Sequence, residues 1–146
     1  MTQAELLHKV EEIIDDAKAG VLVTSDKDGR PHARWMTPAM LKGRPSALYA
    51  VSSPHAAKTM QIEANPCVEW MIQSRNLDRV INLKGRVNIV DNPSLRSEVI
   101  EHIGKRLTVF WKVNPNQMEF VVLETVLEEG TYFLPMRGES VTVTFG

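Results

Sequence analysis

The first 18 residues carry apolar side chains at spacings of three and four, which is the pattern of an amphipathic helix. The apolar positions are Leu6, Leu7, Val10, Ile13, Ile14 and Ala17. Polar and charged residues fill most of the positions between them. We therefore predict a helix over about residues 3–18, which Gly20 ends.

Short apolar stretches separated by turn residues follow this helix. Residues 21–23 lead into Asp26-Lys27-Asp28-Gly29, a turn sequence with glycine where φ can be positive. Pro31 to Pro38 supply the returning strand, so the two stretches form a hairpin. Arg44-Pro45 predicts a further turn, and Leu48 to Ser52 predict a short strand.

The next segment predicts a second helix, over Pro54 to Ala64. Pro54 suits the first helical position because its missing N–H has no role there, and either Ser52 or Ser53 can cap the helix. Asn65-Pro66 closes the helix, because a residue before proline avoids helical geometry.

Alternation of apolar and polar residues returns in the second half of the chain. Cys67 to Gln73 and Arg79 to Val90 predict two strands, and Asn92-Pro93 begins a third helix that Gly104 stops. Three late strands are predicted at Phe120 to Leu127, Thr131 to Leu134 and Val141 to Phe145, joined at Glu129-Gly130 and Arg137-Gly138.

Together these elements predict an α+β fold. Six or more antiparallel strands with short helices at the rim favour a small barrel, and the helices are too few for a doubly wound parallel sheet. The chain shows no internal repeat, low-complexity tract or linker. We therefore treat residues 1–146 as a single domain.

Composition narrows the possible functions. Seventeen lysines and arginines face 18 acidic residues, a formal net charge of −1, so no basic excess indicates a nucleic-acid partner. The apolar runs are too short to span a bilayer, and the N-terminus lacks the sections of a signal peptide. The single cysteine, Cys67, excludes an internal disulfide. From these absences we expect a cytoplasmic protein without a membrane partner.

Arg34 and Lys58 are the strongest candidates for ligand binding. A helix start offers unpaired N–H groups and a partial positive charge, so it favours an anion. Lys58 lies in the first turn of the second predicted helix, where a cation opposes the helix dipole unless an anion binds. Arg34 can grip a phosphate with two hydrogen bonds. Each cation alone also fits a solvated surface position, but together with Ser52 and Ser53 they predict a phosphate site.

Other reactive side chains give weaker signals. The four histidines have no metal-ligand spacing, so no metal site is predicted, although His55 lies at the same helix start. Cys67 is interpreted as a small buried hydrophobic residue rather than a nucleophile. Trp70 is expected in the core. Leu107 to Asn116, which contain Trp111, lack clear periodicity and fit either a ligand cover or a subunit contact.

Three segments resemble the flavin-binding split barrels related to pyridoxamine 5′-phosphate oxidase. They are GVLVTSDKDGRPHARWMTP (Gly20–Pro38), LYAVSSPHAAKTMQIEANPCV (Leu48–Val68) and INLKGRVNIV (Ile81–Val90). With the opening helix, the likeness covers about residues 3–90. It implies a six-stranded antiparallel split β-barrel with short flanking helices. It also implies flavin mononucleotide (FMN), held in a cleft between the two subunits of a homodimer.

The matching positions imply cofactor-binding roles for particular residues. Arg34 and Lys58 would contact the phosphate, with Ser52 or Ser53 assisting at the helix start. Backbone groups would flank the isoalloxazine ring in two stretches, Trp35, Met36 and Thr37 in one and Ala50, Val51 and Ser52 in the other.

Three departures separate the chain from the true oxidases of that family. Ala39 stands where they carry a substrate-binding lysine, and Val80 stands near the place of a glutamine that approaches the flavin. Their arginine-rich C-terminal signature is absent. The resemblance is therefore closer to the short general-stress flavoproteins of the group, and the case for vitamin B6 oxidation is weakened.

Three functions are compatible with this sequence. The first is an FMN-dependent oxidoreductase acting on an unknown small molecule, with no catalytic side chain assigned because flavin carries the hard chemistry. The second is a non-catalytic FMN-binding or electron-transfer protein. The third keeps the barrel but binds haem or a deazaflavin, and haem would require His55 or His32 as an iron ligand.

Overall fold

The computed structural model describes residues 1–104 and 120–146, and the predictions for Leu107 to Asn116, Trp111 included, lie outside these ranges. The elements in chain order are α1 (Gln3–Ala17), β1 (Gly20–Ser25), β2 (Pro31–Met36), β3 (Ala39–Leu41), β4 (Arg44–Ser52), α2 (Ala57–Ala64), β5 (Cys67–Gln73), β6 (Val80–Val90), α3 (Pro93–Ile103), β7 (Val121–Leu134) and β8 (Glu139–Thr144). None of these helices has the length and apolar character that a membrane span needs.

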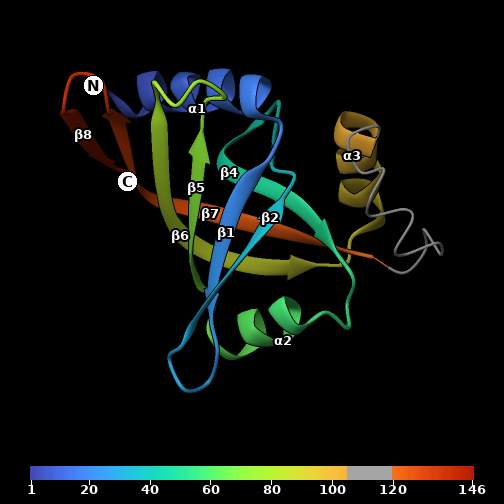
Figure 1. The fold of residues 1–146 in the computed structure, drawn as a ribbon. Helices are drawn as coiled ribbons and strands as arrows, with labels where there is room; N and C mark the ends of the chain where they lie inside the picture. Colours follow the sequence, from blue (N-terminus) through green and yellow to red (C-terminus); the bar gives the residue numbers. More distant parts are fainter. Residues whose placement is uncertain (105–119) are drawn as a thin grey trace.

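The eight strands form one antiparallel sheet that curls into an open barrel (Figure 1). Their order is β2-β1-β5-β6-β7-β4-β3, and β8 pairs with β7. The edge strands β2 and β3 are joined by Thr37 and Pro38 alone, so the two edges meet where the barrel is split. Helix α1 lies across one end of the barrel and α2 lies at the other end (Figure 1). The predicted α+β split barrel is confirmed, with eight strands instead of six.

Most predicted elements lie where the sequence pattern placed them. Helix α1 begins after Thr2, whose hydroxyl accepts the Glu5 N–H at 3.1 Å in a capping box. Strands β1 and β2 form the predicted hairpin, and β5 has the predicted bounds. In β6 the residues alternate between the core and the outer face, as expected. Asn92 caps α3, and Gly104 follows its last residue.

Two helix ends differ from the predictions. Helix α1 is closed by Lys18, which adopts the left-handed conformation with a φ of 67°, whereas Gly20 already belongs to β1. Helix α2 begins only after Ala56, its N-cap residue, and no side chain of residues 1–104 or 120–146 caps it. Pro54 therefore lies in the turn before the helix, and the predicted serine cap is wrong. Asn65 ends α2 as predicted.

Two predicted turns are also wrong. The turn between β3 and β4 lies at Lys42-Gly43, where Gly43 has a φ of 82°, whereas Arg44-Pro45 already begin β4. The expected joint at Glu129-Gly130 lies inside β7, which is continuous. Its pairing with β6 shifts by one residue at Glu128. Such a bulge bends a strand without ending it, so a turn-like sequence here curves the sheet.

Two apolar clusters pack on the two faces of the sheet. The first fills the barrel between α1 and the inner faces of β1, β4, β5, β6 and β7. It contains Trp70, which is fully buried as predicted and donates its indole N–H to Thr125 Oγ1 at 3.0 Å. The second cluster joins α3 to β3, β4 and β7. Helix α2 contributes only Ile62 to these buried clusters.

Helix α1 rests directly on the backbone of β7 at Gly130. A Cβ atom at this position would lie 2.5 Å from Leu6 Cδ2 and 3.0 Å from Leu83 Cδ2. Both leucines are fully buried, so neither has open space to move into. The absence of a side chain at Gly130 therefore allows α1 to lie this close to the sheet.

Candidate functional site

Arg34 and Lys58 come together at the end of the barrel that α2 covers. Arg34 lies on the edge strand β2, opposite Leu22 of β1. Lys58 is in the first turn of α2, which packs against β1. Burial lowers the pKa of Lys58, and the positive charge of Arg34 lowers it further. The two cations are therefore close enough to repel each other.

Three neutral oxygen atoms hold the Arg34 guanidinium. Its Nη1 donates to the Leu22 carbonyl at 3.2 Å and to Thr24 Oγ1 at 2.7 Å. Its Nη2 donates to Gln61 Oε1 at 3.3 Å. Thr24 is buried, and its hydroxyl donates to the same Gln61 oxygen at 2.6 Å. Burial lowers the pKa of Arg34, but a guanidinium stays charged in proteins.

Neither cation has a carboxylate partner within residues 1–104 and 120–146. The ion pairs of these residues involve other lysines, arginines and histidines. Two neighbouring positive charges without a counter-charge are unfavourable. An anion with two negative charges, such as a phosphate monoester, would stabilise the arrangement.

Ser52 is the last residue of β4, and Ser53 begins the connection to α2. The buried Ser52 hydroxyl donates to the Ser53 carbonyl at 3.1 Å and lies 3.2 Å from Thr59 Oγ1. Thr59 Oγ1 donates to the same carbonyl at 2.9 Å, and Ser53 Oγ accepts the His55 N–H at 3.3 Å. These contacts tie the end of β4 to the helix that carries Lys58.

The two stretches predicted to flank a planar ring lie at the ends of β2 and β4. The Trp35 side chain is 84% exposed, Met36 packs against the first cluster, and Thr37 lies in the link to β3. Ala50 and Val51 are buried, so they offer a ligand backbone groups rather than side chains.

The backbone at the end of β4 is open on one side. The ladder between β3 and β4 runs from the turn only as far as the pair Ala39 and Tyr49. Within the described ranges, residues 50–52 therefore pair with β7 alone. Their other side faces the split in the barrel, where a ligand could meet N–H and C=O groups that the sheet does not use.

Two surface cavities lie away from the cation pair. One, of about 550 Å³, lies between α1 and β3 and is lined by residues such as Leu7 and Met40. The other, of about 340 Å³, is lined by residues that include Trp35, Met71 and Arg75. Arg34 and Lys58 line neither cavity. The chemistry of the cations, rather than cavity size, therefore identifies the candidate site.

Thr24 and Gln61 belong to this site and were not found from the sequence. Thr24 occupies an inward position of β1, where a single threonine does not disturb the alternating pattern. Gln61 lies three residues after Lys58, and this spacing places both side chains on one helix face. That spacing was the one available signal for Gln61.

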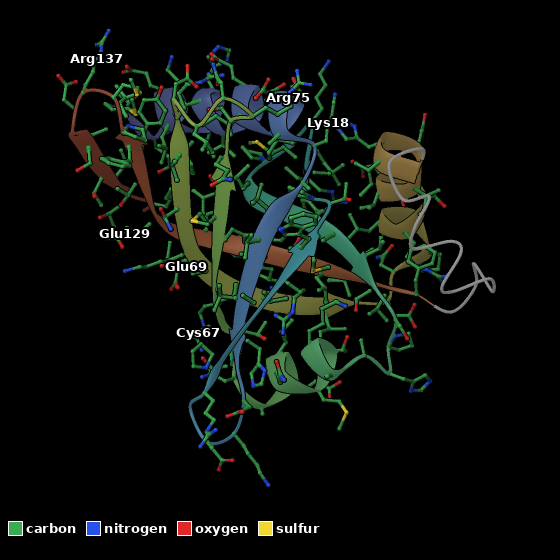
Figure 2. All side chains as sticks on the ribbon, viewed as in Figure 1. Lys18, Cys67, Glu69, Arg75, Glu129 and Arg137 are labelled. Atoms are coloured by element: carbon green, nitrogen blue, oxygen red, sulfur yellow. The ribbon has the colours of Figure 1, made fainter. Side chains whose placement is uncertain are left out.

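The prediction that Cys67 is buried is wrong. Its side chain is exposed, and Arg86 Nη1 lies 3.6 Å from Sγ. Strand β5 alternates so that Val68 points inward, and Cys67 and Glu69 follow one another on its other face (Figure 2). The residues of the described ranges contain no His, Cys, Asp and Glu group that could hold a metal.

Comparison with known proteins adds to this geometry. The family model described as Pyridoxamine 5′-phosphate oxidase matches residues 6–133. A pyridoxine/pyridoxamine 5′-phosphate oxidase of Pseudomonas entomophila (strain L48) is 34% identical over 82 residues. The match covers 56% of this chain and 37% of that relative, so the chain corresponds to little more than a third of the oxidase.

Solved structures share the fold over nearly the whole chain. A Clostridium acetobutylicum protein related to general stress protein 26 has a TM-score of 0.75 at 13% identity, with 99% of this chain and 97% of that chain covered. A pyridoxamine 5′-phosphate oxidase-related, FMN-binding protein of Nostoc punctiforme has a TM-score of 0.73 at 14% identity, with both chains fully covered.

Two further solved structures of this fold carry other descriptions. A haem-binding protein of Mycobacterium smegmatis has a TM-score of 0.72 at 19% identity, covering 99% of this chain and 58% of that chain. An F420 reductase has a TM-score of 0.61 at 19% identity, covering 82% of this chain and 94% of that chain.

Proposed function

The chain belongs to the pyridoxamine 5′-phosphate oxidase family, as its sequence resemblance implied, and on this premise we propose that it is a flavoprotein that binds FMN. Arg34 and Lys58 would hold the phosphate. The supporting observation is that these neighbouring cations have no carboxylate partner within the described ranges. The phosphate of FMN is a dianion near neutral pH, so it would give both cations a shared counter-charge.

The open backbone at the end of β4 supports the same ligand. Residues 50–52 lack a β3 partner in the described ranges, so their peptide groups could meet the polar edge of a flavin ring. Trp35, Met36 and Thr37 would flank the ring from the β2 side. Ser52 and Ser53 would act by fixing the loop before Lys58, because their hydroxyls already take part in hydrogen bonds.

We further propose that the protein is an oxidoreductase acting on a small molecule. Bound FMN supplies hydride and electron transfer. The chain's own part is to bind the phosphate, orient the ring and limit access of water to it. The proposal does not extend to vitamin B6 oxidation, because Ala39 and Val80 depart from the oxidase pattern and the curated relative is matched over 37% of its length.

Other ligands and roles are alternatives to this proposal. A non-catalytic FMN-binding or electron-transfer protein would use the same phosphate contacts. The fold is shared with a haem-binding protein and an F420 reductase, which keeps haem and a deazaflavin as candidates. Haem has little support at this site, because His32 already contacts Asp26 at 2.9 Å and His55 is an exposed loop residue.

We propose a homodimer with the cofactor at the subunit interface. A barrel of this size offers a cleft too shallow to bury a tricyclic ring alone. Trp35 and Met71 also expose apolar surface on the outer face of the sheet, as interface residues commonly do. Sedimentation should give a dimer, and a monomer that binds FMN tightly would contradict this part of the proposal.

A spectrum of the purified protein tests the cofactor. We expect a yellow protein with flavin absorbance near one flavin per chain, and FMN as the mass of the released compound. A sharp haem band or a deazaflavin mass would replace FMN by that ligand. Reduction of the bound flavin by NADH or NADPH, with turnover on an acceptor, would separate an enzyme from a carrier.

A further inference from the structure

The contacts of Arg34 determine which edge of its guanidinium is available. Thr24 Oγ1 accepts from Nη1, Gln61 Oε1 accepts from Nη2, and these two oxygens are 2.6 Å apart. Acceptors this close together occupy one edge, the edge between Nη1 and Nη2. The Leu22 carbonyl takes the second Nη1 hydrogen. Among the described residues, Nε and the second Nη2 hydrogen have no acceptor, and they form a parallel pair of donors suited to a phosphate.

The anchors of Arg34 are uncharged, and this has a chemical consequence. A carboxylate in place of the Gln61 amide would hold the guanidinium equally well, but it would also cancel its charge. The Gln61 and Leu22 carbonyl oxygens and the Thr24 hydroxyl orient the cation and leave its charge for a ligand. The hydroxyl direction is fixed as well, because Thr24 accepts from Arg34 and must then donate to Gln61.

Gln61 also positions the second cation. It lies one helical turn after Lys58, on the same face of α2. Among the described residues, Ile62 is the only α2 residue in a buried cluster, so within these ranges apolar packing holds the helix weakly. The bond from Thr24 to Gln61 joins α2 to β1 at the place where Lys58 must sit. One amide therefore contacts Arg34 directly and fixes the helix that carries Lys58.

We infer that Gln61, supported by Thr24, is a positioning residue for phosphate binding. It aligns the free edge of Arg34 and the ammonium of Lys58 on one phosphate monoester without neutralising either charge. This inference deepens the proposed function and rests on it, because the phosphate is taken to be that of FMN.

The sharpest test replaces Gln61 by glutamate, which has the same shape but carries a negative charge. In Gln61→Glu the new carboxylate pairs with Arg34, so the affinities for FMN and for inorganic phosphate should both fall roughly 10- to 100-fold. Binding of riboflavin, which lacks the phosphate, should stay within about twofold, and the melting temperature should not fall. A variant that only damaged the structure would lose riboflavin and stability as well.

Matched variants control for charge and for the hydroxyl. Gln3→Glu introduces the same negative charge at a different glutamine. Gln3 lies on α1, where it donates to Ser46 Oγ at 2.9 Å. This variant should leave the affinities for FMN, phosphate and riboflavin unchanged. Thr24→Ser keeps the hydroxyl and should bind FMN like the parent protein. Thr24→Val removes it and should weaken FMN and phosphate by about tenfold with little change for riboflavin.

The outcomes separate this inference from the choice of cofactor. If the parent protein binds FMN and Gln61→Glu binds it equally well, the positioning role is wrong and the cofactor stands. If the parent protein binds phosphate but neither flavin, and Gln61→Glu loses phosphate, the positioning role stands and FMN is wrong. If the parent protein binds none of the three probes, both proposals fail.

Discussion

Arginine side chains have different surroundings at the two ends of the barrel. At the α1 end, Arg79 Nη1 contacts Glu12 at 3.0 Å and Arg75 Nε contacts Asp16 at 3.4 Å. Arg75 lies close to the last turn of α1 and Lys18 (Figure 2). At the α2 end, the contacts of Arg34 in the described ranges go to neutral oxygens. Charge joins elements of the fold at the α1 end, whereas at the α2 end the proposed function assigns the charge of Arg34 to a ligand.

The largest effect should come from removing the cations at the α2 end. We expect Arg34→Ala and Lys58→Ala each to weaken FMN binding by about 1.5–3 kcal/mol, the scale of a charge-assisted hydrogen bond. Lys58→Ala should leave the stability of the FMN-free protein unchanged or slightly raised, because it removes a repulsion. Fluorescence titration with FMN measures the loss. Parent-like affinity in both variants would remove the assigned phosphate site.

A smaller effect should appear on raising the pH. Burial and the charge of Arg34 lower the pKa of Lys58. Lys58 therefore loses its proton, and with it its attraction for phosphate, at a lower pH than an ordinary lysine does. We expect FMN binding to weaken by about 1 kcal/mol within one pH unit above that pKa. Over the same range the FMN-free protein should become more stable, because the unfolded chain holds this proton more tightly than the folded chain.

Titrations from about pH 7 to about pH 10, with urea unfolding at each pH, measure both trends. Lys58→Arg is the control, since arginine keeps its charge over this range and should bind FMN with a flatter pH profile. A parent protein and a Lys58→Arg variant with identical profiles would show that Lys58 does not face the phosphate.

At the α1 end we expect the opposite result, a change in stability without a change in FMN affinity. Arg79→Ala should lower the free energy of unfolding by about 0.5–1 kcal/mol, because a partly exposed ion pair stabilises modestly. FMN affinity should not change. Urea unfolding measures the first quantity and titration the second. A marked loss of FMN affinity in this variant would mean that the two ends of the barrel do not have separate roles.

The smallest effect should be that of Arg75→Ala. The Arg75 side chain is 79% exposed, so solvent screens its contact with Asp16. We expect a change of less than about 0.5 kcal/mol in stability and none in FMN affinity. A larger loss of stability that persists in high salt would show that Arg75 acts by packing and not by charge.

The sequence predicted those parts of the fold that carry a regular pattern. Helix α1 has an apolar stripe and a capping box, and β5 and most of β6 alternate between buried and outward positions, so their residues match the structure closely. Strand β3 has three residues, too few for any period to be visible. Glu129-Gly130 resembles a turn, yet these residues continue β7, because Gly130 serves the packing of α1 instead.

The candidate site was predicted in part, for a physical reason. Arg34 and Lys58 were identifiable because an arginine inside an apolar strand and a lysine in the first turn of a helix are both unusual. The serine cap was wrong because Ser52 Oγ donates to the Ser53 carbonyl, Ser53 Oγ accepts from the His55 N–H, and α2 starts only after Ala56. The contact between Gln61 and Thr24 could not be predicted, because it depends on how α2 docks on β1. Periodicity describes single elements and says nothing of such docking.

The close packing of α1 against β7 at Gly130 restricts how the sequences of relatives can differ. Leu6 and Gly130 share one fixed volume, since a methyl group at residue 130 would overlap the leucine. In relatives that keep this helix in place, a larger side chain at one of the two positions should therefore go with a smaller side chain at the other. An alanine at 130 should be accompanied by a smaller residue at 6, and the pair should covary although 124 positions separate them along the chain.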